Sequence, residues 1–104
     1  MRSDIAVLGA GGFGLALAVM LDNMGHNVTV WSKFPEEIEQ IKKDGENKAK
    51  LPGVKIPESI KFSSEASCVK GMDVVIFGIP VVGVRAAAKE VSPYLESKTV
   101  VVNT

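Results

Sequence analysis

Six residues near the start of the chain, Gly9 to Gly14, read Gly-Ala-Gly-Gly-Phe-Gly and match the pattern G-x-G-x-x-G. The pattern follows a short apolar segment and opens one with helical spacing, the usual context of a phosphate-binding turn. Gly9 would permit the tight turn, Gly11 would let a pyrophosphate approach the backbone, and Gly14 would let the helix pack closely. N–H groups around Gly12 and Phe13 would point at the phosphates. The alternative is a turn whose glycines only permit close packing.

The residues after the second apolar segment bear on which dinucleotide such a turn would bind. An Asp or Glu there accepts a hydrogen bond from a free ribose 2′-hydroxyl and repels a 2′-phosphate. This chain has Ser32 and Lys33 instead, so the sequence favours NADP over NAD. Two alternatives stay open: Lys33 is a solvated surface charge, or Glu36 or Glu37 reaches the ribose.

Few other residues are candidates for cofactor binding, catalysis or metal binding. Pro80 ends the fourth apolar segment beside the expected ligand crevice, where it either contacts the cofactor or only ends a strand. We interpret His26 as a surface residue, and Cys68 as an apolar packing residue without a neighbouring base. The sequence lacks the common metal-ligand, Walker A and nucleophile-elbow motifs. It therefore gives no support to a metal site or to a covalent mechanism.

Strands that alternate with helices would place these residues at one edge of a sheet. Short β-branched segments predict strands, and apolar spacings of three and four residues predict helices. Such an alternation builds a parallel sheet, and a central first strand gives the strand order 3-2-1-4-5. The predicted fold class is α/β, a Rossmann-type doubly wound sheet in a single domain. We expect strands at 5–8, 28–31, 60–62, 73–79 and 99–103, and helices at 12–24, 35–43, 63–71 and 81–91.

Two further expectations concern packing and loops. In the first helix, the apolar residues at three- and four-residue spacing predict the face that packs on the sheet. Those residues are Phe13, Ala16, Leu17, Met20, Leu21 and Met24. Between residues 46 and 59, two prolines and a Pro-Gly pair prevent regular structure. Loops of this length in compact domains are often functional.

The composition narrows the class of protein. The chain has 104 residues, with twelve Lys or Arg against twelve Asp or Glu and 46% hydrophobic residues, which predicts one folded domain. The balanced charge argues against nucleic acid or an anionic membrane as a partner. No apolar run is long enough to span a bilayer, and the start lacks a signal-peptide layout. With a single cysteine, the expected location is the cytoplasm.

Several segments together resemble the N-terminal domain of bacterial-type NAD(P)-dependent glycerol-3-phosphate dehydrogenase. They are GAGGFGLALA at 9–18, VTVW at 28–31, NKAKLPGVKIP at 47–57 and DVVIFGIPVVGVR at 73–85. The loop that contains Asn47 is the most specific of them, because a dinucleotide fold in general does not require it. The resemblance implies cofactor contacts at Gly12, Phe13 and Lys33. It also implies reversible reduction of dihydroxyacetone phosphate to sn-glycerol 3-phosphate, which feeds phospholipid synthesis.

The chain departs from this family at several points. The family usually has Ser-Trp where this chain has Gly12-Phe13, a serine or threonine where Val81 stands, and often an arginine near Lys33. The family's active-site lysine follows the fifth strand, so its counterpart would lie beyond Thr104. We therefore expect residues 1–104 to be the dinucleotide-binding domain, inactive alone, ahead of a helical substrate domain. For the full protein, the resemblance implies a small phosphorylated substrate and allows a homodimer.

Two other functions stay open from the sequence. The chain could be the cofactor domain of another two-domain reductase, similar to ketopantoate reductase. It could also be a module that senses a nucleotide without catalysing a reaction. The loop with Asn47 favours the glycerol-3-phosphate dehydrogenase family over the other reductases.

Overall fold

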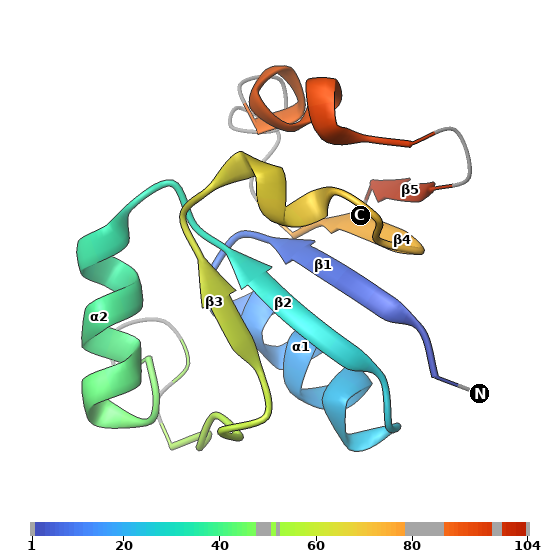
Figure 1. Ribbon diagram of the computed structural model, residues 1–104. Coiled ribbons are helices and arrows are strands. Elements are labelled where there is room, and N and C mark those ends of the chain that lie inside the picture. Colours follow the sequence, from blue (N-terminus) through green and yellow to red (C-terminus); the bar gives the residue numbers. More distant parts are fainter. Residues whose placement is uncertain (1, 48–50, 52, 79–86, 97–98, 104) are drawn as a thin grey trace.

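The computed structural model describes residues 2–47, 51, 53–78, 87–96 and 99–103. Within them, five parallel strands form one sheet in the predicted order, β3-β2-β1-β4-β5 (Figure 1). The Rossmann-type α/β fold is therefore confirmed. The strands are β1 (Asp4–Leu8), β2 (Asn27–Trp31), β3 (Lys61–Ser63), β4 (Val74–Phe77) and β5 (Val100–Asn103). The helices are α1 (Gly12–Asn23) and α2 (Pro35–Asp44), together with the helical residues 87–91. Two short 3₁₀ turns are η1 (Ala66–Val69) and η2 (Ser92–Tyr94).

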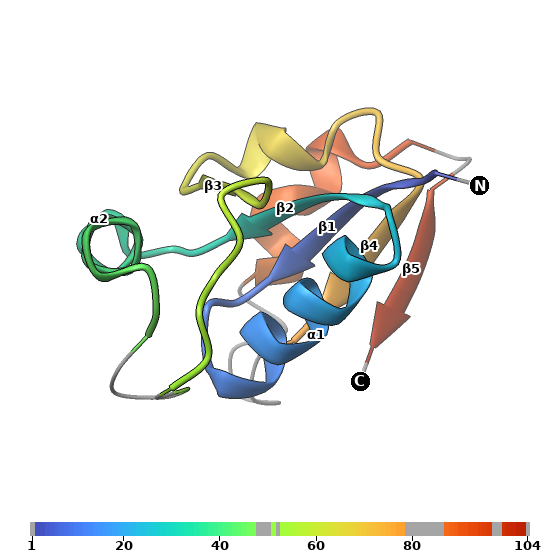
Figure 2. The ribbon, with the colours of Figure 1, turned by 90° about the horizontal axis from the view of Figure 1, so that it is seen from below.

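The central strand β1 is apolar on both of its faces. It pairs in parallel with β2 and with β4, and Ala6, Val7 and Leu8 are completely buried. Because side chains alternate along a strand, Val7 joins the core under α1, whereas Ala6 and Leu8 join the core under η1 and residues 87–91. Figure 2 shows α1 against one face of the sheet and these segments over the other. Because its central strand is covered on both faces, the sheet leaves its carboxyl edge for ligands.

The structure corrects the predicted packing face of α1. Phe13 and Met20, both on the predicted face, are 62% and 51% exposed. Gly14 instead packs against the backbone at the ends of β1 and β4, so the helix turns the face of Gly14 towards the sheet. Nearly every position of this helix is apolar, and apolar spacing could therefore not predict its rotation. The buried residues of α1 are Gly14, Leu15 and Ala18.

The second helix, α2, has the ends that its sequence predicts. Pro35 occupies its first turn, acidic residues follow there, and two lysines lie in its last turn. These charges interact favourably with the helix dipole. Ile38 and Ile41 are its buried residues. Gly45 ends the helix in the left-handed conformation, with φ at 72°. The long loop begins at this glycine.

Other boundaries differ slightly from those predicted. The helix expected at 63–71 is the single turn η1, which buries only Val69 and so gains little from further turns. β4 covers four of the seven residues expected at 73–79. Residues 87–91 form the end of the helix expected at 81–91. Pro80 and the rest of 79–86 lie outside the described residues. Across the described ranges, no helix is long and apolar enough to cross a membrane.

Candidate functional site

The carboxyl ends of the three central strands meet at one edge of the sheet. The Gly9 N–H donates to the Trp31 carbonyl oxygen at 2.7 Å, and the Gly78 N–H donates to the Leu8 carbonyl oxygen at 2.9 Å. These bonds extend the sheet beyond its strands and place the glycine turn between the ends of β2 and β4. Ligands of open parallel sheets bind at this edge. The structure thus brings the glycine turn beside the residues that follow β2.

The three motif glycines differ in the physical reason for glycine. Gly9 has φ of 119°, a conformation that residues with side chains rarely adopt. A Cβ on Gly14 would lie 2.5 Å from the Gly9 carbonyl oxygen, so only glycine lets α1 approach the turn this closely. Gly11 has φ of −76° and ψ of −179°, a backbone conformation open to any residue. Its backbone therefore does not require glycine, whereas a ligand lying against it would.

The first turn of α1 has unsatisfied donors. Its first backbone hydrogen bond runs from the Leu15 N–H to the Gly11 carbonyl oxygen at 2.9 Å, and no side chain caps the helix. In the described part of the chain, no group accepts a hydrogen bond from the N–H of Gly12 or Phe13. Free N–H groups and the helix dipole together attract anions. This end of the helix therefore offers the donors that a phosphate needs.

Ser32 and Lys33 follow β2 at the same edge, and each meets a carboxylate. The buried Ser32 hydroxyl donates to Glu37 Oε1 at 2.8 Å and accepts from the Phe34 N–H at 3.2 Å. Lys33 Nζ lies 3.8 Å from Glu90 Oε1, with both side chains largely exposed. An exposed pair of this kind contributes only about 0–1 kcal/mol. Lys33 can therefore leave Glu90 for a stronger anion at little cost.

The sequence only partly anticipates these carboxylates. The sequence allows Glu37 to reach the ribose, and the structure shows that its carboxylate bonds to Ser32. The position of Glu37 in the first turn of α2, close after β2, is a signal from which this bond can be predicted. Glu90 lies in the segment 87–91, far from Lys33 in the sequence, and no local sequence pattern links the two residues. The polar end of β2 is thus less positive than Ser32 and Lys33 alone suggest.

The long loop after α2 folds back onto the glycine turn. Asn47 is buried, and its side-chain amide donates to the Ala10 carbonyl oxygen at 2.9 Å. The Leu51 N–H donates to the Asn47 carbonyl oxygen at 2.8 Å, and the Ile56 N–H donates to the Gly45 carbonyl oxygen at 2.7 Å. The loop that the sequence marks as functional by its length therefore touches the candidate site. Its contact with Ala10 has no signal in the sequence.

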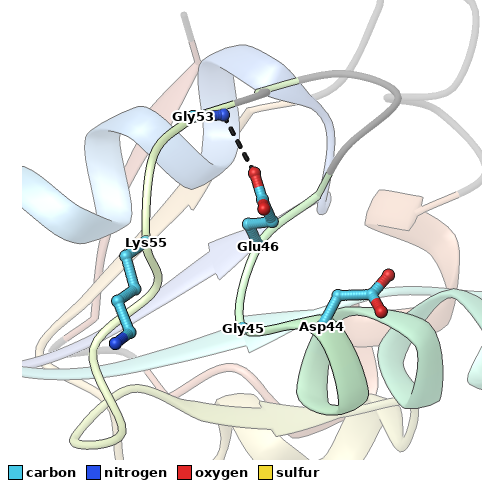
Figure 3. A pocket seen from close by; sticks show the side chains of 5 residues that line it. All are labelled: Asp44, Gly45, Glu46, Gly53 and Lys55. Atoms are coloured by element: carbon cyan, nitrogen blue, oxygen red, sulfur yellow. Dashed lines mark hydrogen bonds between the residues drawn. The ribbon is translucent and has the colours of Figure 1, made fainter.

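The same loop encloses a small pocket beside the end of α2. Figure 3 shows Glu46, whose carboxylate accepts a hydrogen bond from the Gly53 N–H at 2.9 Å. Asp44, Gly45 and Lys55 complete its lining, and the pocket has a volume of about 200 Å³. Small-molecule sites are typically larger, from about 300 Å³. We therefore attribute this pocket to the folding of the loop.

The remaining sequence candidates lie away from the glycine turn or outside the described residues. His26 is half-buried, not fully exposed, and its Nδ1 accepts a hydrogen bond from the Ser3 N–H at 3.1 Å. Burial raises the pKa of the Cys68 thiol, although a hydrogen bond with Ser63 lowers it, so the thiol is a poor nucleophile at neutral pH. Within the described residues, no group of three or more His, Cys, Asp or Glu could hold a metal ion.

Comparisons with known proteins agree with the geometry of this edge. Residues 4–104 match the family model described as NAD-dependent glycerol-3-phosphate dehydrogenase N-terminus. Glycerol-3-phosphate dehydrogenase (NAD(P)+) 2 of Lactobacillus delbrueckii subsp. bulgaricus is 42% identical over 102 residues, which cover 97% of this chain and 30% of the relative. The chain thus spans about a third of the length of the curated relatives that it matches.

Solved structures separate this family from the alternative reductase. The glycerol-3-phosphate dehydrogenase of Coxiella burnetii superposes with a TM-score of 0.89 at 26% identity, over 98% of this chain and 32% of that chain. A putative 2-dehydropantoate 2-reductase from Enterococcus faecalis gives a TM-score of 0.72 at the same identity, over 96% and 33%. The ketopantoate reductase-like alternative is therefore weaker. This chain belongs to the family formed by the N-terminal domains of NAD(P)-dependent glycerol-3-phosphate dehydrogenases.

Proposed function

We propose that residues 1–104 are the dinucleotide-binding domain of a glycerol-3-phosphate dehydrogenase. The observation that carries the proposal is the uncapped start of α1, directly after β1 at the carboxyl edge of the sheet. A pyrophosphate there would accept hydrogen bonds from the N–H groups of Gly12 and Phe13, in the electrostatic field of the helix. Membership of the family supports the same assignment.

The candidate site residues divide by the part of the dinucleotide that they would contact. Gly9, Gly11 and Gly14 shape the turn under the pyrophosphate, as their backbone geometry supports. Ser32 and Lys33 lie where the adenosine ribose would sit, after β2. When bound, NAD(P)H supplies the hydride that reduces dihydroxyacetone phosphate to sn-glycerol 3-phosphate. Pro80 is proposed as a contact on the nicotinamide side from its sequence position alone.

NADP is the preferred cofactor in this proposal. Lys33 can pair with a 2′-phosphate, because its present bond to Glu90 is long and exposed. The Ser32–Glu37 hydrogen bond opposes the preference, since that carboxylate would repel a 2′-phosphate and could accept a bond from a free 2′-hydroxyl. We therefore expect NADPH to bind more tightly than NADH by a modest factor.

We propose that the other catalytic residues lie in a part of the full protein that corresponds to the length of the relatives that this chain does not match. We propose that the active-site lysine lies beyond Thr104 and that a helical C-terminal domain binds the phosphorylated substrate. The full protein would act in the cytoplasm, in glycerophospholipid synthesis, and could form a homodimer. This chain covers 30% to 31% of the length of two curated relatives. Their greater length supports a second domain in the full protein.

Titration of this chain with NADH and NADPH, followed by tryptophan fluorescence, tests cofactor binding. Trp31 is the single tryptophan and is the last residue of β2, paired with Leu8 at the carboxyl end of β1, so a ligand at this edge of the sheet should change its emission. We expect saturable binding of both cofactors. The absence of any change at millimolar concentrations of either one would contradict the proposal.

A pair of matched variants shows where the cofactor binds. Gly11→Val should abolish binding of both cofactors, because its side chain takes the space of the pyrophosphate while its backbone angles suit valine. Ala16→Val adds similar bulk at an exposed position of the same helix and should bind both cofactors normally. Normal binding by Gly11→Val would place the cofactor elsewhere on the chain.

A further inference from the structure

We propose that Asn47 is a positioning residue for the dinucleotide phosphates and acts through the peptide group between Ala10 and Gly11. The inference rests on the dinucleotide binding proposed above. Asn47 is 8% exposed and Ala10 is 3% exposed, and 2.9 Å separates the Asn47 Nδ2 from the Ala10 carbonyl oxygen. A buried bond from one loop to the backbone of another fixes a local conformation more firmly than a solvent-exposed bond does.

The geometry of the peptide group transmits this contact to the phosphate site. A trans peptide directs its C=O and its N–H to opposite sides, and the described residues contain no cis peptide bond. Because the Ala10 carbonyl points to Asn47, the Gly11 N–H points away from the long loop. Gly11 is the N-cap of α1, and among the described residues nothing accepts its N–H. Asn47 therefore sets the direction of one donor at the phosphate site.

Without this bond, the peptide could turn over. The Ala10 carbonyl oxygen would then be buried without its partner, which favours rotation towards water. Gly11 could follow such a rotation, because glycine adopts φ values that other residues avoid. The rotated peptide would present a carbonyl oxygen to the phosphates, and the two would repel each other. Asn47 keeps the donor facing the ligand before the ligand arrives, which lowers the cost of binding.

The long loop itself holds Asn47 in place. The Leu51 N–H donates to the Asn47 carbonyl oxygen at 2.8 Å, and the Ile56 N–H donates to the Gly45 carbonyl oxygen at 2.7 Å. Leu51 and Ile56 also pack into the core under α1. The amide of Asn47 is thus carried by a loop anchored on both sides of it. The role of the loop is to stiffen the glycine turn.

Two variants of Asn47 test the proposal in this chain. Asn47→Ala removes the donor, and Asn47→Asp keeps the shape but places a carboxylate against the carbonyl oxygen. Each should weaken NADH and NADPH binding by about tenfold, the factor expected for one lost buried hydrogen bond. In the ligand-free chain, nuclear magnetic resonance should show altered Gly11 and Gly12 amide signals, while the signals of β4 and β5 stay in place.

Ser59→Ala is the matched control. The Ser59 hydroxyl donates to the Asp22 carboxylate at 2.8 Å, so this variant cuts a different bond of the same loop, to the end of α1 that is far from the glycine turn. It should leave both dissociation constants unchanged. An equal loss in Ser59→Ala, or unfolding of both Asn47 variants in circular dichroism, would overturn the positioning role in favour of general support of the fold.

Wild-type binding separates this inference from the proposed function. If the wild-type chain binds neither cofactor, the proposed function fails. If the wild-type chain binds and both Asn47 variants bind within about twofold of it, only the role of Asn47 fails. Weaker binding by folded Asn47 variants, together with moved Gly11 and Gly12 signals, supports the inference.

Discussion

At the scale of single residues, the choice between cofactors depends on one cation among carboxylates. Lys33→Asp should weaken NADPH binding by about tenfold to a hundredfold, because a charge-assisted bond to the 2′-phosphate is replaced by repulsion. NADH binding should change by less than about threefold, since NADH lacks that phosphate. The two dissociation constants from Trp31 fluorescence measure the difference. Equal losses for both cofactors would show that Lys33 does not select NADP.

Two further substitutions control for overall charge. Lys42→Asp changes the net charge by the same amount at the other end of α2, and it should leave the ratio of the two dissociation constants unchanged. Glu37→Gln removes the carboxylate bonded to Ser32, and it should shift that ratio towards NADPH. A shift towards NADH would show that the carboxylate does not oppose the 2′-phosphate.

At the scale of elements, the approach of α1 to the sheet defines the glycine turn. In Gly14→Ala, the new Cβ would lie 2.5 Å from the Gly9 carbonyl oxygen and 3.3 Å from that of Gly78, so the helix must move. Overpacking of this kind costs about 1–3 kcal/mol of unfolding free energy. Urea denaturation followed by circular dichroism measures the loss.

Gly11→Ala is the companion to this variant. The backbone angles of Gly11 suit alanine, so its unfolding free energy should stay within about 0.5 kcal/mol of the wild-type value. The two glycines thus separate a requirement of folding from a requirement of binding. Similar stability losses for Gly11→Ala and Gly14→Ala would refute this division.

At the scale of the whole molecule, a ligand at the sheet edge stabilises both cores. One sheet carries the core under α1 and the core under residues 87–91, so unfolding of either should release the cofactor. At one hundred times its dissociation constant, NADPH should add about 2.7 kcal/mol to the unfolding free energy. For a domain of this size, the melting temperature should rise by roughly 10–20 °C.

Differential scanning fluorimetry measures this rise. Gly11→Val, whose backbone angles suit valine but which should not bind, should show none of it. The absence of formal net charge does not conflict with binding an anionic cofactor, because backbone N–H groups and the helix dipole form the phosphate site. A rise of the same size in Gly11→Val would show that NADPH stabilises the chain from another surface.

The parallel sheet and the place of the glycine turn can be predicted from the amino-acid sequence, because they follow from local periodicity and from the alternation of strands and helices, and a central first strand then gives the strand order. The tertiary structure alone decided the rotation of α1, since an almost wholly apolar helix has no local preference for one face and the contact of Gly14 selects it. It also decided the bonds of Glu90 to Lys33 and of Asn47 to Ala10. Both join residues far apart in the chain, so they exist only once the sheet and the loop have packed together.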